Sequence, residues 1–206
     1  LVGLIISSIA ALIVSIPTLR LRGDYLAIAT LGFAEIIRIA VLNMDITNGA
    51  AGLTGIPKLT TWPLLFVLMV ISVVIVTNFG RSRQGRACIS VREDEIASEA
   101  MGINTTRYKT TAFVVGAMLA SVAGALYACN FYVIKPDLFT FNKSIDILVM
   151  VVFGGMGSIT GSVIAAVFIG ILNTVLQSFA SLRMIIYGVV LVAIMIFRPS
   201  GLLGTK

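Results

Sequence analysis

Long apolar runs are the feature that most limits how this chain can fold. They cover residues 1–19, 25–42, 62–79 and 110–130, and an almost unbroken stretch runs from 145 to 197. Most are close to the ~20 residues that an α-helix needs to cross about 30 Å of hydrocarbon. A helix satisfies its own backbone hydrogen bonds in lipid, and no alternating strand pattern occurs in the sequence. The sequence therefore predicts an all-α protein, a polytopic transmembrane helical bundle.

Composition supports this fold class and excludes several functions. The mean hydropathy is +1.06, only 12% of the residues are charged, and the chain contains no histidine. A soluble domain of 206 residues needs more polar surface than this. Cys88 and Cys129 lie in different segments and form no metal or redox motif. We therefore expect no catalytic residues, no metal and no cofactor, which argues against an intramembrane enzyme.

The net charge of +6 is unevenly distributed. It could fit nucleic acid or anionic lipid, but six of the fifteen basic residues lie in one loop, 80–109. Basic loops remain in the cytoplasm, so we place this loop there and expect lipid, not nucleic acid, around the chain. The spans on either side of this loop cross the membrane, so the connections at 43–61 and 131–144 are expected on its outer side. The six basic residues are Arg81, Arg83, Arg86, Arg92, Arg107 and Lys109.

The stretch 145–180 is too long for one crossing. It would measure about 54 Å as a continuous helix, and it contains FGGMGSITGS at 153–162, whose glycines favour a break. A break gives spans at 145–156, about 158–180 and 184–197, hence about seven spans and a cytoplasmic C-terminus. The glycine segment is either a tight turn between helices or a broken helix that lines a transport path.

We expect residues 1–206 to form a single transmembrane domain, with 80–109 as a cytoplasmic loop within it. The chain begins with Leu1 inside an apolar run, without a charged leader. We therefore expect a chain that is truncated at its N-terminus.

Small residues recur at every fourth position of the run 110–130. Such faces let helices approach closely in lipid, so we expect a packing contact within the bundle. The face comprises Gly116, Ala120, Gly124 and Ala128, and Gly157, Gly161 and Ala165 repeat the pattern.

Glu35 and Arg38 stand three residues apart within the run 25–42, so their side chains can meet on one helix face. Ionisable groups in a span usually mark a function. Here the opposite charges also fit a structural ion pair, with Arg38 extending toward the outer rim. Both a structural pair and a role in the pathway or gate stay open.

The charged segment RQGRACISVREDEIASEAMGIN at 83–104 predicts a short helix at the membrane surface. Ser90 and Glu93 have the spacing of a capping box, carboxylates follow in the first turn, and Gly102 can end the helix. The predicted helix, 91–101, is too short and too charged to span. Its apolar face is either a docking surface or part of an amphipathic linker. That face consists of Ile96, Ala97, Ala100 and Met101.

Several blocks in order, LRLRGDYLAIATLGFAEIIRI, TNGAAGLTGIPK, GRACISVREDEIASEAMGIN, VVFGGMGSITGS and FRPSGLLG, resemble LivM-type permeases of branched-chain amino acid ABC transporters. The resemblance covers essentially the whole chain. It implies a transport subunit without catalytic chemistry in a bacterial inner membrane. The partners it implies are a second, homologous permease, two cytoplasmic ATP-binding subunits that hydrolyse ATP, and an extracytoplasmic substrate-binding protein.

In that family, a cytoplasmic loop of EAA type docks its helix in a cleft of the ATPase, and Glu99, Ala100 and Gly102 match a loose version of it. The resemblance thus implies that 91–101 is a coupling helix. We expect Arg92, Glu93, Asp94 and Glu99 to supply polar contacts and Ala97, Ala100 and Met101 the buried face.

The sequence is compatible with several alternatives. The outer stretch from Asn43 to Lys58 contacts the binding protein or is a flexible connection. A sugar-type ABC permease and a stand-alone secondary transporter or channel share the general architecture. The substrate is open among leucine, isoleucine, valine, other amino acids and urea-like solutes, and substrate-binding residues cannot be assigned from the sequence.

Overall fold

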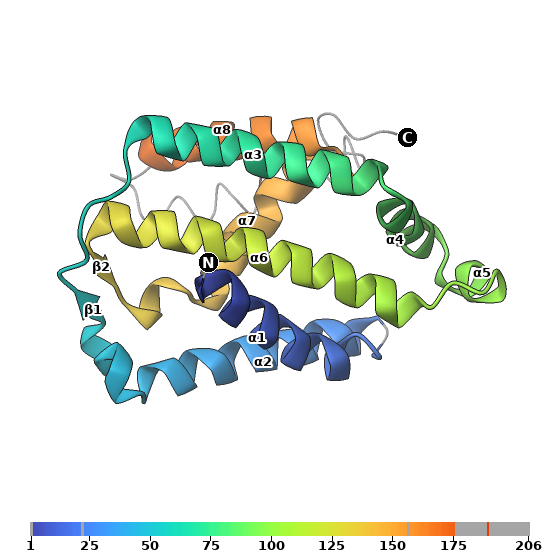
Figure 1. Ribbon diagram of the computed structural model, residues 1–206, viewed down its shortest axis with the longest axis horizontal. Coiled ribbons are helices and arrows are strands. Elements are labelled where there is room, and N and C mark those ends of the chain that lie inside the picture. The colour runs from blue at the N-terminus through green and yellow to red at the C-terminus, as the bar shows by residue number, and fades with distance from the viewer. Residues whose placement is uncertain (1, 22, 156, 176–188, 190–206) are drawn as a thin grey trace. The chain divides into compact units, whose positions relative to one another are not determined.

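The computed structural model describes residues 2–21, 23–155, 157–175 and 189 (Figure 1). The described residues are mostly helical, as the apolar runs predict. The chain divides into two compact units, the first ending at Phe139 and the second starting at Thr140.

The first unit contains the helices of membrane length. Three described stretches are long and apolar enough to cross a membrane, namely Tyr25–Leu42, Trp62–Arg81 and Thr105–Phe131. A shorter apolar helix precedes them and packs along the last of the three. These elements are α1 (Val2–Thr18), α2 (Asp24–Leu42), α3 (Trp62–Arg81) and α6 (Thr105–Phe131).

Local signals in the sequence explain where these helices begin and end. Pro63 occupies the first turn of α3, where its missing N–H costs nothing. Asn104 caps α6, because its side chain accepts a hydrogen bond from the Arg107 backbone N–H at 3.0 Å. Tyr132 then ends α6 in a left-handed conformation, with φ of 62°.

At one end of the first unit, two connections that are far apart in sequence pair with each other. Strand β1 (Leu53–Thr54) lies antiparallel to β2 (Val133–Ile134), with Leu53 opposite Ile134. The approach is close, since a Cβ on Gly52 would lie 2.1 Å from the Ile134 carbonyl oxygen. Short 3-10 helices flank the pair: η1 (Asp45–Thr47), η2 (Gly49–Ala51) and η3 (Pro136–Leu138). The expectation of an all-helical chain thus misses two short strands.

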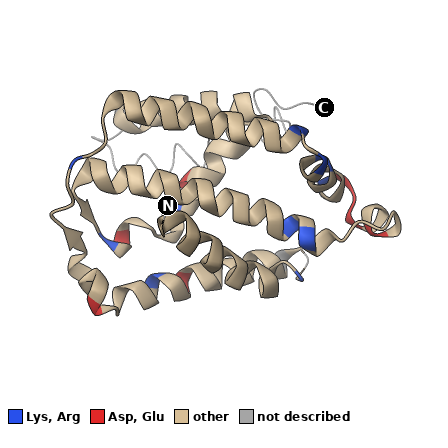
Figure 2. Ribbon diagram, viewed as in Figure 1, with Lys and Arg blue, Asp and Glu red and all other residues tan. Residues whose placement is uncertain are grey.

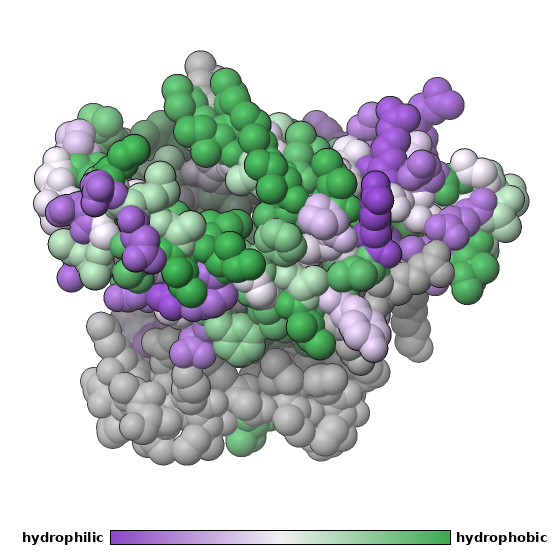
Figure 3. Space-filling view, turned by 90° about the horizontal axis from the view of Figure 1, so that it is seen from below, coloured by the Kyte–Doolittle hydropathy of each residue, from purple (hydrophilic) through white to green (hydrophobic). Residues whose placement is uncertain are grey.

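At the other end of the first unit lie α4 (Arg83–Glu93) and α5 (Glu95–Ala100). Basic residues gather on α4 and at the start of α6 (Figure 2). On the face shown in Figure 3, hydrophobic residues predominate in the middle of the described surface and hydrophilic ones gather toward its ends. This distribution is typical of a protein whose central zone faces lipid.

The described part of the second unit includes α7 (Phe141–Gly154) and the apolar helix α8 (Ile159–Val175). Their core includes Val149, Phe153, Ala165 and Ile169. The Phe153 ring stacks on Phe168, with centroids 5.4 Å apart.

The predicted break in the stretch 145–180 is confirmed. Gly155 and Gly157 have φ values of 104° and 96°, which residues with a side chain rarely adopt. Among the described residues, the first six predicted spans correspond to helices, although α7 begins at Phe141 instead of 145. These helices are α1, α2, α3, α6, α7 and α8. The seventh predicted span, 184–197, lies outside the described residues.

Candidate coupling site

Helix α4 is held firmly against the end of α3. The Ser82 hydroxyl caps α4 by accepting from the Gly85 backbone N–H at 3.1 Å. Gly85 is buried, and a Cβ there would lie 2.0 Å from the Phe79 carbonyl oxygen, so the contact requires glycine. The chain therefore turns at Ser82 between α3 and α4, and the close packing fixes the angle between the two helices. We call this junction at Ser82 the elbow.

The predicted start of the coupling helix is wrong. The segment forms two helices, because α4 ends at Glu93 and α5 begins at Glu95. Ser90 is not a cap but lies inside α4, where its hydroxyl donates to the Ala87 carbonyl oxygen at 2.9 Å. The physical reason is that Ser82 caps α4, which therefore begins at Arg83, well before Ser90. The backbone N–H groups that follow Ser90 then already have partners within α4 and need no cap.

Asp94 caps α5 in place of Ser90. Its backbone is extended, and its carboxylate accepts from the Ala97 backbone N–H at 2.9 Å. The proposed capping box between Ser90 and Glu93 is therefore corrected to an aspartate cap at Asp94.

The predicted stop at Gly102 is confirmed. Gly102 has a φ of 81°, and its N–H donates to the Glu99 carbonyl oxygen at 2.9 Å. The Ile103 N–H donates to the Ser98 carbonyl oxygen at 3.0 Å. These two bonds form a Schellman motif, which satisfies the last carbonyl groups of α5.

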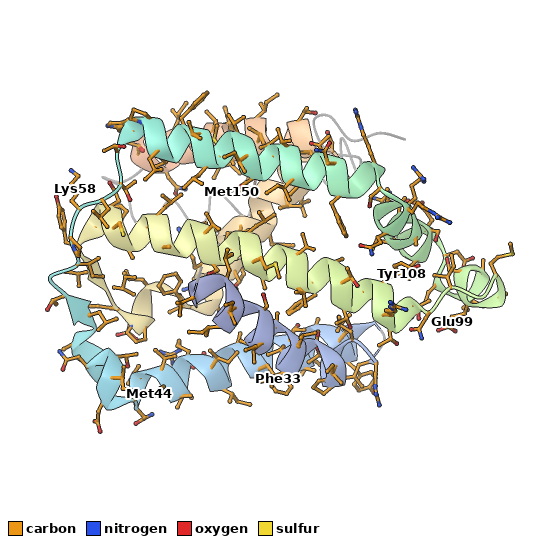
Figure 4. All side chains as sticks on the ribbon, in the orientation of Figure 1. Phe33, Met44, Lys58, Glu99, Tyr108 and Met150 are labelled. Atoms are coloured by element: carbon orange, nitrogen blue, oxygen red, sulfur yellow. The ribbon has the colours of Figure 1, made fainter. Side chains whose placement is uncertain are left out.

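Polar side chains on one face of α5 attach it to the start of α6. Lys109 Nζ lies 2.7 Å from Glu95 Oε2, with the two side chains only 22% and 26% exposed. The Thr105 hydroxyl donates to Glu99 Oε1 at 2.9 Å, and Ser98 is buried nearby. Figure 4 shows Glu99 beside this junction. The six residues of α5 are thus fixed by tertiary contacts, since so short a helix has little stability of its own.

The opposite face of α5 is apolar and exposed. Ile96 and Met101 are 72% and 82% exposed, and Ala97 and Ala100 are exposed beside them. Large apolar side chains gathered on an otherwise polar segment are typical of a binding surface. We call Ile96, Ala97, Ala100 and Met101 the outward face of α5.

The eight residues predicted for coupling fall into different positions. Ala97, Ala100 and Met101 lie on the outward face, while Arg92 and Glu93 are exposed and form an ion pair with each other at the end of α4. The remaining three residues shape α5 itself: Asp94 caps its start, Glu99 anchors it to Thr105, and Gly102 ends it.

Sequence reasoning missed the anchoring pair Glu95–Lys109. The two residues are fourteen positions apart in different helices, so no local spacing could have indicated their contact. Next to Lys109 in sequence, the Tyr108 carbonyl oxygen accepts a hydrogen bond from the Cys88 thiol of α4 at 3.4 Å. Figure 4 shows Tyr108 near the start of α6. Burial between α4 and α6 raises the pKa of the Cys88 thiol above its ordinary value.

At the other end of the first unit, Glu35 and Arg38 form the predicted pair. One Arg38 terminal nitrogen lies 2.5 Å from Glu35 Oε1, and the other lies 3.3 Å from Asp137 Oδ1 in η3. The sequence did not reveal Asp137, which is about a hundred residues away. Arg38 therefore ties α2 to the connection that follows β2, an arrangement that favours the structural interpretation of the pair.

The two predicted small-residue faces, one on α6 and one on α8, differ in whether another helix contacts their glycines. A Cβ placed on Gly161 would lie 2.1 Å from the Gly154 carbonyl oxygen, so α7 and α8 meet closely there. Gly116 and Gly124 have no such neighbour, since no described atom comes within 4 Å of a Cβ placed on either. Helix α1 instead approaches α6 at Ser121, whose hydroxyl lies 3.2 Å from a Cβ on Gly3. A packing role for the face from Gly116 to Ala128 stays a prediction.

Membrane-length helices, joined at one end by a capped helical elbow and at the other by paired connections, define a multi-pass helical membrane protein. The sequence profile of a family described as "Branched-chain amino acid transport system / permease component" matches residues 1–197. The chain belongs to this family.

Individual relatives agree with the family match. LivM of Salmonella typhimurium, a high-affinity branched-chain amino acid transport system permease protein, is 37% identical over 97% of this chain and 55% of its own length. LivM of Escherichia coli is 36% identical over the same shares. LivH of Escherichia coli is 31% identical over 70% of this chain and 48% of its own length. The chain thus spans about half the length of these relatives. No solved structure gives a significant match.

Proposed function

We propose that the chain is the membrane-spanning permease subunit of an ATP-driven importer, and that it forms part of the pathway for branched-chain or related amino acids. The names of its relatives support the substrate class. The observation that carries the proposal is α5, which pairs a polar anchored face with an exposed apolar face. A helix that only connected two spans would not need such a surface.

The proposed partners follow from this role. A second, homologous permease completes the pathway, and the similarity of the chain to both LivM and LivH supports such a pair. Two cytoplasmic ATP-binding subunits hydrolyse ATP, so this chain is not itself the enzyme. An extracytoplasmic substrate-binding protein delivers the amino acid.

We place the chain in the bacterial inner membrane, with α4, α5 and the C-terminus in the cytoplasm. The basic residues on α3, α4 and the start of α6 support this orientation through the positive-inside rule (Figure 2). The outward face of α5 then docks on the ATPase, with Arg92 and Glu93 as polar contacts at its rim. Closure of the ATPase subunits moves α5, and the elbow at Ser82 passes the motion to α3.

Purification and reconstitution test the class of protein. The full-length permease pair should copurify with an ATP-binding subunit and should take up leucine into vesicles only when ATP and the binding protein are supplied. Uptake by the permease pair alone, driven by an ion gradient, would contradict the proposal and favour a secondary transporter.

The same orientation places the paired connections on the outside, where the segment from Asn43 to Lys58 meets the binding protein. Pairing of β1 with β2 and the Arg38–Asp137 contact support a shaped surface over a loose connection. Cysteines introduced at Asn48 and Thr54 should cross-link to the binding protein. An absence of cross-links in both nucleotide states would favour a mere connector.

A further inference from the structure

Two neighbouring pockets of the first unit lie between α3 and α6. The inner pocket has a volume of about 240 Å³ and is also lined by Gly3 and Leu4 of α1. The outer pocket, of about 550 Å³, opens beside the start of α3. Thr60 lines both, and its hydroxyl donates to the Leu126 carbonyl oxygen at 3.1 Å. Thr60 is buried, and the two pockets adjoin at its side chain.

The two pockets differ in chemistry. Polar groups gather in the outer pocket, which is lined by Lys58, Thr61 and Asn130 among others. The inner pocket is aliphatic. Its apolar walls include Leu59, Leu64, Leu68, Val122, Ala125 and Leu126.

Lys58 is the charged group of the outer pocket. Its ammonium is exposed and lies 5.8 Å from the centroid of the Tyr132 ring, within reach of a weak cation–π contact. Among the described residues, no carboxylate forms an ion pair with it, whereas Arg38, Arg92 and Lys109 each have one. Figure 4 shows Lys58 on the segment that leads into α3. A cation without an acidic partner at the mouth of an aliphatic pocket is suited to a ligand carboxylate.

We propose that these pockets form a binding site for an aliphatic α-amino acid on its way through the permease. Lys58 and the Asn130 amide hold the ligand carboxylate in the outer pocket, and the branched side chain enters the inner pocket past Thr60. This arrangement matches a molecule that carries a carboxylate at one end and an aliphatic group at the other. The inference rests on the proposed transport function and adds residues to it.

The role of the inner pocket can be tested with a larger side chain that occupies part of its volume. In the complete transporter, Ala125→Leu narrows the inner pocket, while Ala123→Leu adds the same side chain to an exposed position of α6 that lines neither pocket. Uptake of leucine and valine is measured separately. Because aliphatic pockets discriminate about tenfold or more per methylene, Ala125→Leu should lower the leucine-to-valine uptake ratio about tenfold. Ala123→Leu should leave it unchanged.

The outer pocket is tested through its charge. Lys58→Gln should lower uptake at low substrate concentration about tenfold, because it removes a charged hydrogen bond to the carboxylate. Lys58→Arg should retain most of the activity. Lys58 is the last residue of the segment proposed to meet the binding protein, and here its side chain is assigned to the ligand, while the residues before it are left to the binding protein. Stimulation of ATP hydrolysis by the binding protein should therefore be unchanged in both variants.

Three results would decide against the site. An unchanged leucine-to-valine ratio in Ala125→Leu would assign the inner pocket to lipid or to another part of the protein. Normal uptake by Lys58→Gln would remove the carboxylate contact. A joint loss of uptake and ATPase stimulation in Lys58→Gln would mean that Lys58 touches the binding protein. If the unaltered complex shows no ATP-driven uptake, the proposed function fails instead.

Discussion

At the scale of single residues, several glycines allow close backbone contacts in the described part of the chain. Gly154 and Gly161 allow the backbones of α7 and α8 to touch, and Gly85 does the same for α3 and α4. Sequence patterns do not separate these positions from Gly116, which has open space around it among the described residues. A small-residue pattern predicts that another helix can approach closely. Which of the small residues it contacts depends on the position of that neighbouring helix, which the pattern does not give.

The glycine contacts lead to a prediction about stability. Gly161→Ala would place its Cβ 2.1 Å from the Gly154 carbonyl oxygen, so the helices must separate. We expect the detergent-solubilised protein to lose about 1–3 kcal/mol. Gly116→Ala is the matched control and should be neutral or slightly stabilising, because alanine favours a helix. Equal thermal unfolding temperatures for the two variants would show that α7 and α8 do not meet at Gly161.

The pair Glu35–Arg38 can be tested against its two interpretations. If the pair is structural, Arg38→Gln alone should reduce the amount of folded protein, since it leaves Glu35 without its partner. The double variant Glu35→Gln/Arg38→Gln removes both charges of the pair, and it leaves Asp137 without Arg38 but 63% exposed, where solvent can replace the lost contact. It should therefore keep uptake within about twofold of the unaltered protein, as exchanging an ion pair for neutral groups costs little. A double variant that reaches the membrane in normal amounts yet transports nothing would assign the pair to the pathway.

At the scale of elements, α5 depends on contacts with α6. The Glu95–Lys109 ion pair is partly buried at 2.7 Å, so charge reversal at one position places like charges together. Lys109→Glu should weaken the coupling of ATP hydrolysis to uptake, and Glu95→Lys/Lys109→Glu should restore much of it. A double-mutant cycle on thermal stability should give a coupling energy of about 1 kcal/mol. Strictly additive effects would mean that this pair does not anchor α5.

The elements of the chain were predictable to different degrees. Hydropathy and length located the membrane helices, and the glycines of 153–162 located the break between α7 and α8, because both signals are local. The start of α5 was misplaced because Ser90 and Asp94 both have side chains that cap helices, and only the earlier start at Ser82 decides between them. Pairings between distant residues, such as Arg38 with Asp137, leave no local pattern.

At the scale of the whole molecule, the proposed function assigns a task to each end of the first unit. The paired connections carry Lys58 and the outer pocket, and the opposite end carries the elbow and the outward face of α5. Helices α3 and α6 run between the two ends, since each has one terminus in each region. In the proposed mechanism, motion applied to α5 reaches the proposed amino acid site through α3 and α6.

The most direct measurement of this account is coupling in a variant of the outward face. Ala100→Arg places a long charged side chain on that face without touching the cap at Asp94 or the stop at Gly102. Gln84→Arg, on the exposed surface of α4, is the matched control. We predict that the Ala100→Arg complex remains in the membrane but loses both ATP-driven leucine uptake and stimulation of ATP hydrolysis by the binding protein, while the control keeps both. Normal uptake by the Ala100→Arg complex would contradict the role of α5 as the contact that transmits the ATPase cycle.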